Sequence, residues 1–128
     1  MKKVLLITIC CLCLCGCNSD YKNYESNKYD LYIDENTLAS TYENNELDGN
    51  KKYFGKRIKT SSTFESVSSG TFSGLMLYMN KIYCSSFNSK DDEGKLSELN
   101  KGQSISIIGT ADTWVSSKLN LKDCEILN

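Results

Sequence analysis

Apolar and polar positions change their period about a third of the way along the chain, and the change predicts a helix followed by a sheet. Between Glu35 and Leu47 the apolar residues fall near one helical face, and Asp34 is placed to cap the first turn. The turn residues at 48–50 are expected to end this helix. From Lys56 onward apolar residues alternate with polar ones, as they do in half-buried strands. The pattern therefore predicts one N-terminal helix and then a mostly β domain.

Five strands are expected in the β region. They cover residues 56–67, 75–79, 82–87, 105–109 and 119–126. A short helix marked by Leu96 and Leu99 separates the third strand from the fourth. The step of three from Leu121 to Cys124 predicts a β-bulge near residues 122–123 if both side chains face inward. Five strands with this helix give the element order of an OB-fold, so the expected class is all-β with minor helices, a five-stranded OB-fold barrel preceded by an N-terminal helix.

The first 16 residues differ from the rest of the chain because a short apolar run follows two lysines. The run from Val4 to Cys15 has twelve residues, whereas a membrane-spanning helix needs about 20. Its order of charged, apolar and small residues is typical of a secretory signal peptide. A metal cluster is the alternative interpretation of the cysteines between residues 10 and 17. They are interleaved with Leu and Ile, however, where cysteine acts as a small hydrophobe.

The segment Leu14-Cys15-Gly16-Cys17 resembles the lipobox of bacterial lipoproteins. In that family the cysteine is lipidated on sulfur and the chain is cut just before it. The resemblance implies that residues 1–16 are removed and that Cys17 anchors the protein to a membrane by acyl chains, facing outside the cytoplasm. Which membrane it would be, inner or outer, is left open.

Residues 17–33 are expected to be the lipidated cysteine and a flexible tether, since they are rich in polar residues and tyrosine and have no apolar period. A docking strip of tyrosines is the alternative. One folded domain, residues 34–128, would follow the tether.

Charge and composition narrow the function of that domain. The chain has 15 basic and 16 acidic side chains. Loss of residues 1–16 would remove two lysines and no acid, which leaves a net charge of −3. A nucleic-acid-binding domain is normally basic. The chain also has no histidine and no phosphate loop, nucleophile elbow or metal-ligand spacing.

We therefore expect a binding or interaction module of the cell envelope that is not an enzyme and that holds no cofactor and no metal. Its expected partners are the membrane and an envelope protein or a saccharide. The alternative function is an OB-fold protein that binds nucleic acid.

Two cysteines remain beyond the predicted signal, Cys84 in the third strand and Cys124 in the fifth. These strands can approach each other in an OB barrel, so the two could form a disulfide in an oxidising compartment. The alternative is a pair of buried thiols that pack as small apolar groups. The sequence leaves both open.

Aromatic residues mark a candidate ligand-binding surface. OB folds bind ligands on strands two and three and on the loops after strands one and four. Four aromatic residues fall in those regions: Phe72, Tyr78, Tyr83 and Trp114. Trp114 is expected in the loop between the fourth and fifth strands. Such side chains stack on sugars, bases or protein segments, and packing in the core is the alternative.

Two longer stretches support a family resemblance. Tyr53-Phe54-Gly55-Lys56-Arg57-Ile58 precedes Leu99-Asn100-Lys101-Gly102-Gln103-Ser104-Ile105-Ser106-Ile107-Ile108-Gly109 in the chain. Together they resemble the bacterial tRNA_anti-like family of OB-fold domains, found in many small exported proteins and lipoproteins. The resemblance covers about residues 35–127 and implies the fold, but it implies no established RNA binding. Thr60-Ser61-Ser62 departs from the more usual apolar-Thr-Gly run.

Overall fold

A computed structural model describes residues 24–70 and 74–127. The predicted signal peptide, Cys17 and Phe72 lie outside the described residues. The elements follow in this order: β1 (Leu31–Tyr32), α2 (Glu35–Asn44), α3 (Glu46–Tyr53), β2 (Arg57–Gly70), β3 (Gly74–Met79), β4 (Ile82–Cys84), α4 (Lys90–Gly94), a 3₁₀ helix (Lys95–Glu98), β5 (Ser104–Val115) and β6 (Lys118–Ile126).

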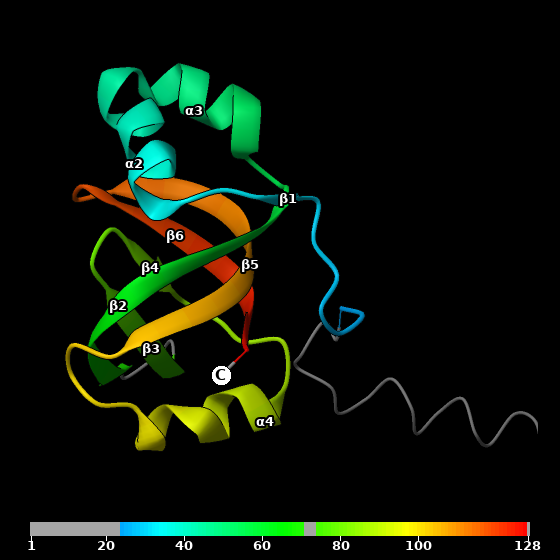
Figure 1. Ribbon diagram of the computed structural model, residues 1–128, viewed down its shortest axis with the longest axis vertical. Helices are drawn as coiled ribbons and strands as arrows, with labels where there is room; N and C mark the ends of the chain where they lie inside the picture. The colour runs from blue at the N-terminus through cyan, green and yellow to red at the C-terminus, as the bar shows by residue number, and fades with distance from the viewer. Residues whose placement is uncertain (1–23, 71–73, 128) are drawn as a thin grey trace, which may run out of the picture.

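Five of the strands pair into a ring. The order is β2-β3-β4-β6-β5, and the pairing of β2 with β5 closes it (Figure 1). The long β2 makes this closure because its first half pairs with β5 and its second half with β3. The short β1 adds to β2 in parallel, outside the ring. The predicted mostly β, OB-like class is confirmed, and β1 is a strand that the sequence pattern did not predict.

The helices lie at the two ends of the ring, with α2 and α3 at one end and α4 at the other (Figure 1). Apolar side chains that alternate inward along the strands fill the space between. Those of the strands that belong to this core with at most 1% of their surface exposed are Ile58, Leu77, Met79, Ile82, Cys84, Ile105, Ile107, Ala111, Leu119, Leu121, Cys124 and Ile126. Leu38 and Tyr42 of α2 join this core.

The predicted single helix was wrong in its second half. Asn45 interrupts it, and the Asn45 side chain accepts hydrogen bonds from the backbone N–H groups of Leu47 (3.1 Å) and Asp48 (3.2 Å), which starts α3. Gly49, which was expected in a turn, lies within α3. A Cβ there would come within 2.5 Å of the Tyr42 ring. This glycine therefore permits close packing between two helices instead of ending one.

Three strand boundaries also differ from the prediction. The first strand of the ring, β2, continues to Gly70 instead of ending at residue 67. The third strand of the ring, β4, ends at Cys84, and Phe87 makes only an isolated bridge to Cys124. The next strand, β5, continues to Val115 instead of ending at Gly109. A Cβ at Gly109 would lie 2.8 Å from the Cβ of Leu121, so β5 can cross β6 closely there and continue.

The predicted β-bulge is confirmed. The register between β5 and β6 shifts between Ile108↔Glu125 and Thr110↔Lys122. Asp123 takes a positive φ of 51°. The extra residue lets Leu121 and Cys124 both face the core.

Residues 24–33, expected to belong to a free tether, lie against the ring instead. The backbone N–H of Asp30 donates to the carbonyl of Arg57 at 2.7 Å, and that of Ile33 donates to the carbonyl of Lys59 at 3.1 Å. Leu31 and Ile33 pack on the core. We call residues 24–33 the N-terminal strap; with it, the folded unit begins before residue 34.

Candidate ligand-binding face

Two tyrosines of the predicted surface form a pair on the outside of the ring. Tyr78 in β3 and Tyr83 in β4 are direct cross-strand partners. Their rings stack with centroids 5.8 Å apart and planes 24° apart. Each is half-buried because its neighbours along the strand, such as Leu77 and Cys84, point inward while the tyrosine points outward.

A hollow of about 290 Å³ lies beside this pair. We call it the tyrosine hollow; it is lined by Met76, Tyr78, Tyr83, Val115, Ser116 and Lys118. The last three residues come from the turn between β5 and β6, where Val115 pairs with Lys118 around Ser116 and Ser117. Both serines have positive φ, 53° and 65°, as a tight two-residue hairpin requires. A strand pair and a hairpin turn thus form one face.

The positive charge in the hollow, that of Lys118, is largely compensated by neighbouring groups. The ammonium group of Lys118 donates to the backbone carbonyls of Asn80 (2.7 Å) and Met79, and it pairs with Glu65 at 3.2 Å. Burial raises the pKa of Tyr83, and the nearby Tyr78 and Asp112 raise it further. The phenol is therefore neutral at physiological pH. The hollow offers aromatic faces and hydroxyl groups instead of free positive charge.

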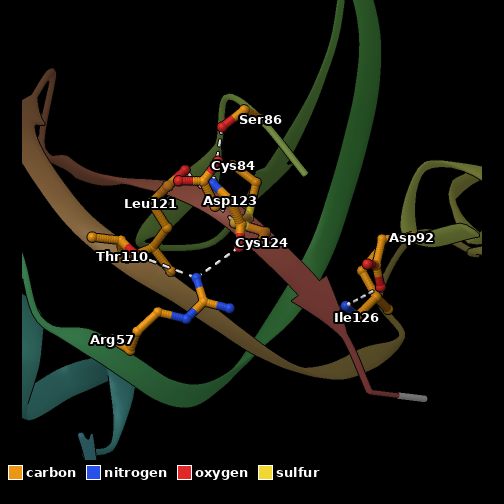
Figure 2. The surroundings of a disulfide bond; sticks show 9 residues. All are labelled: Arg57, Cys84, Ser86, Asp92, Thr110, Leu121, Asp123, Cys124 and Ile126. Carbon is orange, nitrogen blue, oxygen red and sulfur yellow. Dashed lines mark hydrogen bonds between the residues drawn. A yellow bond between two sulfur atoms is a disulfide. The ribbon is translucent and has the colours of Figure 1, made fainter. Parts of the chain in front are cut away.

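A disulfide lies behind the tyrosine pair, on the core side of β4. The structure joins Cys84 to Cys124, with Cα atoms 6.2 Å apart and no exposed surface on either residue (Figure 2). Since Cys84 follows Tyr83 directly, the bond ties the tyrosine-bearing strand to β6. Of the two alternatives that the sequence left open, the structure contains the bonded one.

Trp114 does not line this hollow. The expectation that it lies in a loop was wrong, because β5 extends through it. Its ring stacks on that of Tyr42 at 5.2 Å with planes 7° apart, beneath α2. The position therefore agrees with the packing alternative. Phe72 lies outside the described residues.

Arg57 is a basic residue whose environment the sequence did not reveal. It is only 7% exposed. One terminal nitrogen donates to Thr110 Oγ1 (3.2 Å) and to the carbonyl of Asp123 (2.7 Å), as Figure 2 shows. The Tyr24 ring covers the guanidinium at 4.1 Å. Burial lowers the pKa of Arg57. Alternation along β2 places Ile58 inward and Arg57 outward, so the pattern gave no signal of this burial.

Residues 24–70 and 74–127 lack two further features. No group of three or more His, Cys, Asp or Glu side chains there could hold a metal ion. No helix in that part of the chain is both long and apolar enough to cross a membrane.

The ring, with its helices at the two ends, defines an OB-like domain. A family model described as tRNA_anti-like matches residues 2–125. The chain therefore belongs to the tRNA_anti-like family.

Two solved structures are similar to this chain at low sequence identity. A protein from Klebsiella pneumoniae subsp. pneumoniae, provisionally described as a nucleic acid-binding lipoprotein, superposes with a TM-score of 0.61 at 13% identity, over 78% of this chain and 92% of the other. RecG bound to a three-way DNA junction matches with a TM-score of 0.48 at 14% identity, over 79% of this chain and 13% of RecG. No curated protein matches the chain.

Proposed function

We propose that this protein is a lipid-anchored, exported binding module of the bacterial envelope, in which the five-stranded ring serves as an OB barrel. Its tyrosine hollow would hold the ligand. The observation that carries this proposal is the stacked, half-buried pair of Tyr78 and Tyr83, which borders a hollow of about 290 Å³. Aromatic rings in such a position offer large contact area at low entropic cost.

The chemistry of the hollow favours a neutral ligand, either a saccharide or an extended protein segment. Lys118 is engaged by two carbonyls and Glu65, so it is poorly placed to neutralise phosphates. The chain from Cys17 onward carries a net charge of −3, and Lys118 is the one basic residue among the described residues that line the hollow, so the hollow itself offers a polyanion little attraction. We propose binding without catalysis, because the sequence contains no histidine and no motif of nucleophilic catalysis.

Anchoring is supported by sequence. Leu14-Cys15-Gly16-Cys17 follows an apolar run too short for a stable span. The Klebsiella pneumoniae protein of similar fold is itself described, provisionally, as a lipoprotein. Membrane location and export follow from the anchor, and the intact mass of protein from native membranes tests both. We expect a chain that begins at Cys17 and carries diacylglycerol; a soluble, unprocessed chain would contradict the anchor.

A second candidate function is nucleic-acid binding. The description of the Klebsiella pneumoniae protein favours it. Two stacked aromatic rings on one strand pair would also suit the bases of a single strand.

Retention of the protein on immobilised ligands distinguishes the two candidate functions. Mature protein is applied to purified peptidoglycan and to immobilised single-stranded DNA at low and physiological salt. We expect salt-resistant retention on peptidoglycan, weakened about tenfold by Tyr83→Ala because one aromatic stacking contact contributes about 1–3 kcal/mol. The control Tyr32→Ala, an exposed tyrosine outside the hollow, should bind as the unchanged protein does.

Two outcomes would overturn the first function. Retention on DNA that falls steeply with salt and depends on Tyr83 would favour the nucleic-acid candidate. Equal loss of retention in both tyrosine variants would place the ligand elsewhere.

A further inference from the structure

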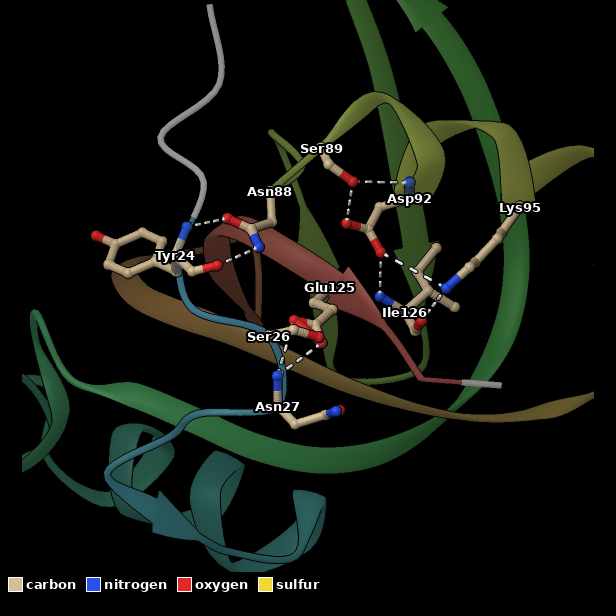
Figure 3. Close-up of polar contacts among 9 residues, drawn as sticks. All are labelled: Tyr24, Ser26, Asn27, Asn88, Ser89, Asp92, Lys95, Glu125 and Ile126. Carbon is tan, nitrogen blue, oxygen red and sulfur yellow. Dashed lines mark hydrogen bonds and ion pairs between the residues drawn. The ribbon is translucent and has the colours of Figure 1, made fainter.

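The N-terminal strap is held by buried polar side chains of the ring. Asn88 accepts a hydrogen bond from the backbone N–H of Tyr24 (2.6 Å) and donates one to the Tyr24 carbonyl (3.1 Å) (Figure 3). Glu125 accepts from Ser26 Oγ (3.1 Å) and from the backbone N–H of Asn27 (3.0 Å). Both side chains belong to residues only 6% exposed. A carboxylate and an amide buried in this way fix the course of the strap along the ring.

The strap starts close to the proposed anchor. Seven residue steps separate Cys17 from Tyr24, and a fully extended chain spans at most about 3.5 Å per step, so roughly 25 Å joins the two. For comparison, a 20-residue helix is about 30 Å long, so even fully extended the segment from Cys17 to Tyr24 is shorter than such a helix. If Cys17 is anchored, Tyr24 and the start of the strap stay within about 25 Å of the membrane surface.

Exposed aromatic side chains are concentrated in the strap and in the residues that lead into its partner strand, β2. Of the five large apolar or aromatic residues that are exposed in the described parts of the chain, three lie in the strap or directly before β2: Tyr29 (43%), Tyr32 (61%) and Phe54 (56%). Tyrosine and other aromatic side chains are enriched at the level of lipid headgroups, where one end of the ring is apolar and the other wet.

Lysines accompany these aromatic residues. Tyr32 is the strand partner of Lys59, whose ammonium group lies 5.4 Å from the centre of the Tyr29 ring. Lys56 is exposed two residues after Phe54. Within residues 24–70 and 74–127 neither Lys56 nor Lys59 makes an ion pair within 4.0 Å. Their positive charge is therefore available to a surface of opposite sign. We call Tyr29, Tyr32, Phe54, Lys56 and Lys59 the strap face.

We propose that the strap face docks on the anionic lipid surface of the membrane to which the chain is anchored, so that the domain has a fixed orientation there. The inference rests on the lipid anchor of the proposed function. A diacylglycerol anchor has two acyl chains and holds the chain at the membrane, but it does not orient the domain; a basic patch beside the anchor adds an electrostatic contact that does. Each lysine near an anionic surface strengthens the contact about fivefold. β4 is not adjacent to β1 or β2 in the strand order, so docking leaves Tyr83 accessible.

The orientation can be measured on lipidated protein from native membranes in nanodiscs of phosphatidylglycerol and phosphatidylcholine that contain a gadolinium-chelating lipid. The broadening of amide NMR signals then reports distance from the lipid surface. We expect Tyr29, Tyr32 and Phe54 to broaden most and Tyr83 least. Lys56→Glu with Lys59→Glu should remove this contrast, whereas Lys101→Glu, an exposed lysine between the 3₁₀ helix and β5, should keep it. The same spectra report whether each variant is folded.

Three results would overturn the proposal. Uniform broadening, or stronger broadening at Tyr83 in a lipidated sample, would show a domain that is free or oppositely oriented. An unchanged contrast in discs of phosphatidylcholine alone would exclude charge as its cause. Protection of Tyr29 and Phe54 by a copurified protein would make the face a protein interface. The intact mass of the same sample reports the anchor separately, because a chain without diacylglycerol overturns the anchor and, with it, the docking.

Discussion

Two aromatic stacks lie on the same ring and differ in what covers them. Tyr42 of α2 stacks on Trp114 of β5 at 5.2 Å, packs against Gly49 of α3 and is 2% exposed. Tyr78 and Tyr83 stack at a similar 5.8 Å, but both remain half-buried beside a hollow. Ring distance alone does not distinguish a structural stack from a binding surface. The covering element does, since it decides whether the aromatic surface is already removed from water.

The largest expected difference between the stacks is in stability. Tyr42→Ala would leave a cavity beside Gly49 and Trp114, and we expect it to lower the free energy of unfolding by about 3–5 kcal/mol. Tyr83→Ala removes a half-exposed ring, so its expected cost is about 1 kcal/mol. Urea denaturation of both variants tests this. Equal losses would mean that the Tyr78–Tyr83 pair is a structural element.

The disulfide gives a second way to examine the comparison, because it anchors β4 and thus Tyr83 but not Trp114. It closes a loop with a sequence separation of 40. Replacing Cys84 and Cys124 together by Ala should cost about 3–4 kcal/mol in the chain-entropy model. Urea denaturation with and without reductant measures the loss. The double variant is the control for the reductant: the reductant should destabilise the unchanged protein and should leave the double variant unaffected. If reductant does not change the urea denaturation of the unchanged protein, that result would contradict the disulfide.

The sequence predicted most of the ring because its signals were local. Alternation gave five strands, and the step of three between Leu121 and Cys124 correctly gave the bulge at Asp123. Tyr78 and Tyr83 were placed on one surface because the strand order of an OB fold makes their strands neighbours.

The errors concern long-range packing. Nothing near Gly49 in the sequence shows that the Tyr42 ring occupies the space of its missing side chain. Trp114 was assigned to a loop because the Thr and Asp residues before it resemble a turn, whereas the pairing of β5 with β6 keeps them extended. The polar strap looked like a tether because its partners, Asn88 and Glu125, lie more than 60 positions away.

The smallest expected effect concerns a single hydroxyl group of the covered stack. Burial, together with Tyr53 and Glu46, raises the pKa of Tyr42 to about 12, compared with about 10 in an unfolded chain. The folded protein thus keeps a proton that the unfolded chain loses, and stability should fall as pH rises from about 10 to 12. Among the described residues the Tyr42 hydroxyl has no hydrogen-bond partner, so Tyr42→Phe should change stability at pH 7 by less than about 1 kcal/mol. Urea denaturation at a series of pH values should show a shallower decline for Tyr42→Phe than for the unchanged protein. Because every other ionisable group is the same in both proteins, the difference between the slopes isolates Tyr42. Identical slopes would contradict a tyrosine whose pKa is raised by burial.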